Sequence, residues 1–199
     1  IPWENIKFNY FFLISSIVLI FVNFLLGSWA WFFIIKCMNV DFSFKRSLRI
    51  VAKSRLAKYI PGGIWQTVGR IYLMEKENIS KAKVRAGALI ETQFLLLTAL
   101  IFLIFTFWLG FFPALSGKKV SAIILLAILI VGFNPKVINH LINFVGRFFH
   151  IPNLRIDLHW RDISILSSVY FAAWVIQGFA FFFLLGSIYS IPFSLCPMV

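Results

Sequence analysis

An uncharged run at residues 8–35 constrains the fold of this chain more than any other feature. It is longer than the roughly 20 apolar residues that a helix needs to cross the hydrocarbon core of a bilayer. Inside that core every backbone N–H and C=O must be hydrogen-bonded within the protein, and a single helix achieves this by itself. The run therefore predicts a membrane-spanning helix that ends near Lys36.

Further apolar segments predict an all-α, polytopic integral membrane protein with about four spanning helices. We expect the second span at 86–112, in a helix that begins earlier because Ser80 is a good N-cap. The third span is expected at 120–133, which is short, and the fourth at 163–189.

Composition supports this class: 61% of the 199 residues are hydrophobic and only 13% are charged. An ordinary soluble domain is about half apolar and a quarter charged, so a soluble domain and a nucleic-acid-binding module are both excluded. Lys and Arg number 19 against 7 Asp and Glu. In so apolar a chain, this excess indicates contact with anionic lipid headgroups.

The two ends lead us to expect one membrane domain over residues 1–199, truncated at both ends. The chain opens with Ile1, and residues 163–199 contain no Asp, Glu, Lys or Arg.

The basic residues orient the predicted spans. Residues 36–85 carry 12 Lys or Arg and three acids, so this connection is expected in the cytoplasm of a multi-pass plasma-membrane protein. The pair Lys118-Lys119 falls on the outer side in this topology and is the exception.

The first half of this connection predicts a two-faced helix. Projected at about 100° per residue, four cations share one arc and form an expected surface stripe: Lys45, Arg46, Arg49 and Lys53. Arg55 and Lys58 instead project onto the apolar face, which we expect to point into protein or hydrocarbon (Phe44, Leu48 and Val51). Cations at membrane depth need partners and mark a candidate functional site.

The run Pro61-Gly62-Gly63 ends that helix, and helical character resumes from residue 64. The start of a helix presents free N–H groups that suit phosphate. We therefore expect residues 43–77 to form a re-entrant hairpin that places Arg55, Lys58 and Arg70 beside an anion site. The alternative is a pair of interfacial helices joined by a turn.

Glu91 follows the last cation of this connection within the second predicted span, and 26 uncharged residues come after it. An unpaired carboxylate at that depth is costly. We expect Glu91 to pair with Arg55, Lys58 or Arg70; the alternative is a solvated carboxylate in the headgroup zone.

Residues 136–149 carry apolar side chains at helical spacing. They predict either a helix on the membrane surface or an extension of the short third span.

Together, the run from Arg55 through Pro61-Gly62-Gly63 to Trp65, the following Arg70 and the later Glu91 resemble the membrane region of the lysylphosphatidylglycerol synthase, or flippase-like, family. The resemblance implies a lipid-handling domain that binds or translocates an anionic phospholipid or a lipid-linked phosphate. It also implies the candidate site residues, which are Arg55, Lys58, Pro61, Gly62, Gly63, Arg70 and Glu91.

Some family members fuse this region to a soluble aminoacyl-transferase, so the alternative function is the membrane half of a lipid-modifying transferase. A third hypothesis is a scaffold whose basic hairpin only docks on anionic lipid. No catalytic motif stands in the sequence, and we expect no metal and no cofactor.

Overall fold

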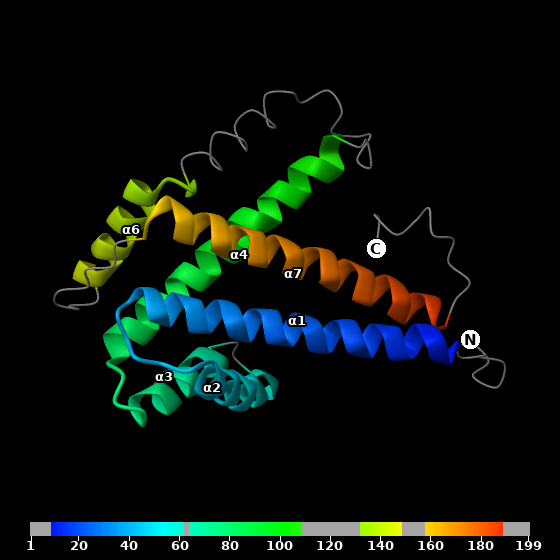
Figure 1. Ribbon diagram of the computed structural model, residues 1–199, viewed down its shortest axis with the longest axis horizontal. Coiled ribbons are helices and arrows are strands. Elements are labelled where there is room, and N and C mark those ends of the chain that lie inside the picture. The colour runs from blue at the N-terminus through cyan, green and yellow to red at the C-terminus, as the bar shows by residue number, and fades with distance from the viewer. Residues whose placement is uncertain (1–8, 62–63, 109–131, 149–157, 189–199) are drawn as a thin grey trace.

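The computed structural model describes residues 9–61, 64–108, 132–148 and 158–188, and the regular structure of these residues is helical. Figure 1 shows the elements in space. Their bounds are α1 Tyr10–Cys37, α2 Phe44–Leu56, the short 3-10 helix η2 Ala57–Tyr59, α3 Trp65–Glu75, α4 Lys81–Trp108, α6 Pro135–Phe148 and α7 Trp160–Gly186. The predicted all-α fold is confirmed.

Three of these helices, α1, α4 and α7, are long and apolar enough to cross a membrane, with mean hydropathies of 2.3, 2.2 and 1.9 over their spanning windows. They correspond to the predicted spans 8–35, 86–112 and 163–189. The side chain of Ser80 accepts a hydrogen bond from the N–H of Lys83 (3.4 Å), as expected of the N-cap of α4. The predicted third span, 120–133, lies outside the described residues except at its last two positions.

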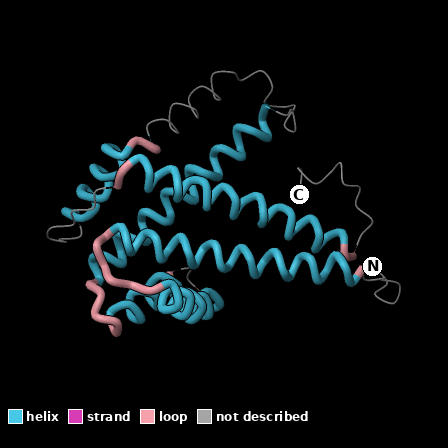
Figure 2. Tube along the Cα trace, viewed as in Figure 1, coloured by secondary structure: helices cyan, strands magenta, loops and turns pink. Residues whose placement is uncertain are grey.

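The spanning helices α1 and α7 lie side by side and run antiparallel, while α4 crosses them at an angle (Figures 1 and 2). The N–H of Asn9, just before α1, donates to the carbonyl of Ser187, just after α7 (2.9 Å). The C-terminal end of α1 and the N-terminal ends of α4 and α7 therefore lie at the same end of the molecule.

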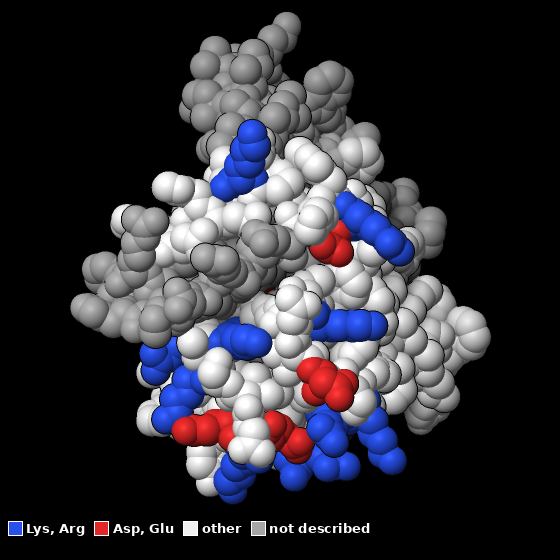
Figure 3. All heavy atoms as spheres, turned by 60° about the vertical axis from the view of Figure 1, so that its left-hand side comes forward, with Lys and Arg blue, Asp and Glu red and all other residues white. Residues whose placement is uncertain are grey.

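Lys and Arg side chains gather at that common end, with a few acids among them (Figure 3). The basic end includes Lys36 at the last turn of α1, Lys83 in α4 and Arg161 in α7. Lys83 Nζ closes the end of α1 by donating to the carbonyl of Met38 (3.0 Å).

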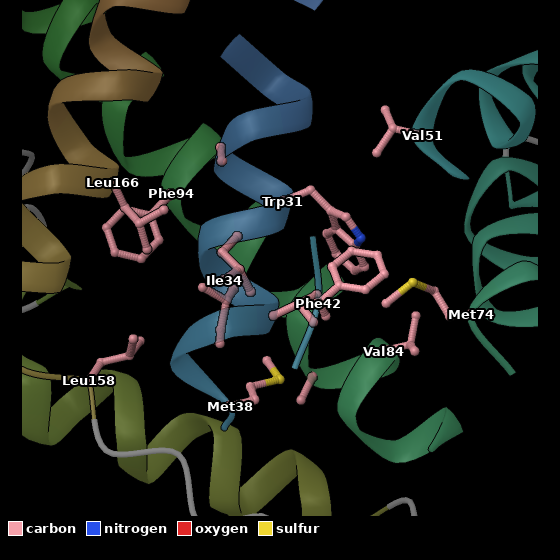
Figure 4. Close-up of a cluster of buried hydrophobic side chains, with 14 of the residues drawn as sticks. Trp31, Ile34, Met38, Phe42, Val51, Met74, Val84, Phe94, Leu158 and Leu166 are labelled. Carbon is pink, nitrogen blue, oxygen red and sulfur yellow. The ribbon is translucent and has the colours of Figure 1, made fainter. Parts of the chain in front are cut away.

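The hydrophobic core surrounds only the second half of α1. Trp31, Ile34 and Ile35 are fully buried there, among side chains of α2, α3, α4 and α7 (Figure 4). The first half of α1 instead exposes a row of large apolar side chains, namely Tyr10, Phe11, Ile14, Ile17, Val18, Ile20, Phe21 and Val22. Apolar exposure of this kind along a candidate span suits contact with lipid.

The predicted helix at 136–149 is present as α6. It begins after a break at Phe133–Asn134 and lies across the basic end of the molecule in Figure 1. Within α6, Ile138 is fully buried, and Asn139 Oδ1 accepts from the N–H of Leu158 (3.4 Å). The break makes α6 a helix separate from residue 132, and its place on the membrane surface stays a prediction.

Candidate functional site

The basic connection folds into a hairpin of α2 and α3 that packs against the second half of α1. Ser43 caps α2 by accepting from the N–H of Arg46 (3.4 Å). Ser47 Oγ, on the buried face of α2, donates to the carbonyl of Ser28 in α1 (2.8 Å). Small residues permit this close helix contact.

A glycine brings α3 equally close to α2. A Cβ added at Gly69 would lie 3.7 Å from Ala57 Cβ and 4.0 Å from Ser54 Cα, which is ordinary van der Waals contact. The two arms of the hairpin thus form one packed unit, and the unit lies beside the body of α1.

The predicted apolar face of α2 is wrong in part. The buried positions are Ser47, Ile50, Val51 and Ser54, whereas Phe44 is 37% exposed. Arg55 and Lys58, which we expected to point inward, are both exposed. The reason is that α2 ends at Leu56 and tightens into η2, so a 100° projection cannot be extended to residue 58.

The predicted stripe of four cations on the opposite face is exposed throughout, as expected (Lys45, Arg46, Arg49 and Lys53). Arg46 Nε lies 3.8 Å from Glu77 Oε2, and both side chains are accessible. Pairs of this kind contribute little to stability because water screens them.

Arg70 of α3 and Glu91 of α4 form an ion pair in the interior. The Nη1 of Arg70 donates to Oε2 of Glu91. Arg70 is only 5% exposed. Glu91 lies ten residues into α4, about 15 Å along the helix from its basic end. Of the three partners that the sequence left open for Glu91, the structure selects Arg70.

The ring of Trp31 covers this cation. The guanidinium carbon of Arg70 lies 4.2 Å from the centroid of the Trp31 ring. The side chain of Trp31 is fully buried. An indole face attracts a guanidinium electrostatically, and the attraction is stronger where water is excluded.

Three buried polar atoms beside or near this pair have no hydrogen-bond partner among the described residues: Arg70 Nε, Trp31 Nε1 and the hydroxyl of Tyr170. Tyr170 of α7 stacks on Phe94, which lies one turn after Glu91 in α4 (ring centroids 6.2 Å apart). Buried polar groups are normally hydrogen-bonded. The interior between α1, α3, α4 and α7 therefore has unused capacity to bind polar atoms.

Arg55 lies next to this cluster with its charge uncompensated. Its guanidinium carbon is 4.8 Å from the centroid of Phe24 in α1, and a Cβ added at Gly27 would lie 3.2 Å from its Nη2. Its side chain is exposed, and the charges that act on it most are those of Arg70 and Glu91. No carboxylate lies within 4.0 Å of Arg55 among the residues that the structure describes.

The structure thus brings together Arg55, Arg70 and Glu91 of the predicted site. Lys58 does not join them: it stands exposed on η2. The carbonyl of Pro61 accepts a hydrogen bond from Trp65 Nε1 (2.9 Å), which closes the turn of the hairpin. Gly62 and Gly63 lie outside the described residues.

Sequence reasoning missed the residues of α1 and α7 that complete the site. Phe24, Gly27 and Trp31 form the surface on which the two arginines lie, and Tyr170 approaches from α7. A signal was available for Gly27 and Trp31, since the run at residues 27–31 interrupts a helix built mainly of aliphatic residues and Phe. That signal does not say which face of α1 they share.

Among the described residues, no group of three or more His, Cys, Asp or Glu is arranged to hold a metal ion. The chemistry of the site is that of cations, aromatic faces and one carboxylate. Cations of this kind bind anions, and their ion-pair partners can be exchanged.

A comparison with protein families matches residues 5–195 to the model described as the lysylphosphatidylglycerol synthase TM region. The chain belongs to this family. Neither the curated proteins nor the solved structures that were compared give a match. The family and the three apolar helices together make the chain an integral membrane protein of a lipid-related family.

Proposed function

We propose that this domain is flippase-like and binds or translocates an anionic phospholipid or a lipid-linked phosphate. Arg55 is the principal headgroup ligand, and Lys58 adds charge at the entrance. Arg70 contributes its free N–H, Glu91 is the counter-charge, and the turn at 61–63 shapes the site.

The observation that carries this proposal is the position of Arg55 along α1. Arg55 lies over Phe24, and Phe24 is 13 residues, or about 20 Å, from the basic end of this 28-residue helix. An uncompensated cation near the middle of a spanning helix is expensive, so such residues generally serve a substrate. The phosphate of a lipid would supply the missing negative charge.

The surface of the hairpin tip supports burial in the bilayer. Leu56, Tyr59 and Ile64 are 70%, 87% and 64% exposed. Apolar side chains presented so fully at the tip favour contact with hydrocarbon over contact with water. This favours the re-entrant arrangement of residues 43–77 over a hairpin that lies on the surface.

The charge at the common end supports a cytoplasmic location for that end. Lys and Arg are enriched in the cytoplasmic connections of membrane proteins. The hairpin would then open toward the inner leaflet, where anionic lipids gather and attract its exposed stripe.

A leaflet-sidedness assay tests the proposal. Full-length protein is reconstituted in liposomes that contain labelled phosphatidylglycerol, and the label that reaches the other leaflet is measured. Arg55→Ala with Lys58→Ala should abolish translocation. The matched control, Lys45→Ala with Arg49→Ala, removes the same charge from the exposed stripe and should retain it. Unchanged translocation in the first variant would refute the assigned site.

A further inference from the structure

Two side-chain amides meet near the midpoints of α1 and α7. Asn23 Nδ2 donates to Oε1 of Gln177 (2.6 Å). Both residues lie deep within candidate spans, far from the basic end where the charged side chains of these helices lie. Amides at that depth either join helices or serve a polar substrate.

The exposure of the pair distinguishes these two roles. The other polar link between α1 and α7, from Ser16 Oγ to the carbonyl of Ala180 (2.8 Å), is fully buried, as a packing contact should be. Gln177 is exposed and Asn23 only half-buried. A Cβ added at neighbouring Gly178 would meet nothing within 4 Å, so the space beside the pair is open.

The pair uses little of its hydrogen-bonding capacity. Each amide carries two N–H donors and one carbonyl acceptor, and the single bond between Asn23 and Gln177 engages one donor and one acceptor. The remaining groups have no partner among the described residues. Unpaired amide N–H and C=O groups are costly in hydrocarbon unless a polar ligand binds them.

Asn23 lies on α1 close to the residues that contact Arg55. Gly27 follows Asn23 by one helical turn and lies directly under the guanidinium of Arg55, with 3.2 Å between an added Cβ and Nη2. A polar group released by Arg55 toward the far end of α1 would meet Asn23 and Gln177 next. Because they are uncharged and carry both donors and acceptors, the amides can bind a phosphate without trapping it.

We propose that Asn23 and Gln177 form a second, uncharged binding step for the phosphate-bearing headgroup of a lipid, next to Arg55 along α1. This step rests on the proposed function and deepens it. Arg55 captures the headgroup by charge, and the amides hold it near mid-membrane while its chains stay in lipid.

Paired leucine substitutions test the step. Asn23→Leu with Gln177→Leu keeps side-chain bulk and removes the amides. We expect translocation of labelled phosphatidylglycerol to slow by about three- to tenfold, the value of one or two lost hydrogen bonds. The swap Asn23→Gln with Gln177→Asn retains both amides and should restore most of the rate. The control Ser16→Ala removes the buried α1–α7 hydrogen bond and should leave the rate near that of the wild type.

A second measurement separates failure of the step from failure of the proposed function. Phosphatidylglycerol with a photoreactive headgroup is incubated with the full-length wild type, and labelled peptides are identified. Label near Asn23 that disappears in the leucine pair supports the step even where bulk translocation is slow. Labelling confined to the region of Arg55, or an equal loss of rate in Ser16→Ala and the leucine pair, would overturn the step and leave the Arg55 site standing. Absence of wild-type translocation together with absence of any label would overturn both.

Discussion

Arg70 and Glu91 join the non-spanning helix α3 to the spanning helix α4 through an ion pair in the protein interior. Arg70 is almost fully buried, and the Glu91 side chain is 20% exposed. The pair fixes the inner arm of the hairpin to the transmembrane bundle. It also compensates the charge of Arg70, whereas Arg55 has no carboxylate within 4.0 Å among the described residues.

Removing one partner of this pair should be strongly destabilising. Arg70→Ala leaves Glu91 without its cation, and loss of one partner from a buried pair costs about 3–5 kcal/mol. Arg70→Met with Glu91→Leu removes both charges and should recover much of that loss. Thermal unfolding in detergent micelles measures both variants. Equal midpoints for Arg70→Ala and the wild type would show that the pair does not anchor the hairpin.

Trp31 should matter more to stability than its neighbour Trp29. Trp31→Leu loses the contact with Arg70 and opens a cavity in a fully buried site, at a cost of about 2–4 kcal/mol. Trp29 stacks on Phe33 (5.3 Å between centroids) and is only half-buried, so Trp29→Leu should cost less than about half as much. The same unfolding experiment compares them, and a larger loss for Trp29→Leu would contradict the assigned role of Trp31.

The open side of Gly27 should be needed for headgroup binding. Gly27→Leu places a side chain where Nη2 of Arg55 now lies, so the guanidinium must move off α1. We expect lipid translocation to fall by about tenfold or more, as for the loss of a hydrogen bond to a charged group. The unfolding temperature should change much less than in Arg70→Ala.

Gly178→Leu is the control for the unfolding measurement alone, because an added Cβ at Gly178 meets nothing within 4 Å, and this open space lies beside the proposed Asn23–Gln177 step. It should leave the folded state intact. A wild-type translocation rate in Gly27→Leu would mean that Arg55 does not act from its place over α1.

A charge-preserving change distinguishes a phosphate site from a docking surface. Arg55→Lys keeps the charge but loses the planar fork that binds two phosphate oxygens at once. Translocation by this variant should drop about tenfold, while its binding to vesicles of anionic lipid should not change. If the hairpin only docks on lipid, Arg55→Lys will match the wild type in both measurements.

The spanning helices could be predicted from sequence because their signal is local. The uncharged run at 8–35 anticipates α1 within two residues at each end, and Ser80 correctly marks the start of α4. Apolar length and a capping side chain act through near neighbours in the chain, so no knowledge of packing is required.

The site was less predictable because its geometry depends on contacts between helices. The sequence offered three cations as partners for Glu91, and only the packing of α3 on α4 selects Arg70. Lys58 was placed on the wrong face because the chain leaves α-helical geometry at residue 57. The contact of Trp31 with the buried guanidinium of Arg70 likewise depends on how α3 packs on α1.

The central claim is that the tip of the basic hairpin lies inside the bilayer, and a spin label on that tip tests it most directly. A label at Leu56→Cys and one at Arg49→Cys, in full-length protein with Cys37 and Cys196 replaced by Ala, are compared in liposomes for collision with oxygen and with a water-soluble nickel chelate. The account predicts that the label at residue 56 collides mainly with oxygen and the label at residue 49 mainly with nickel. Equal and high nickel accessibility at both positions would place the hairpin in water and contradict the claim.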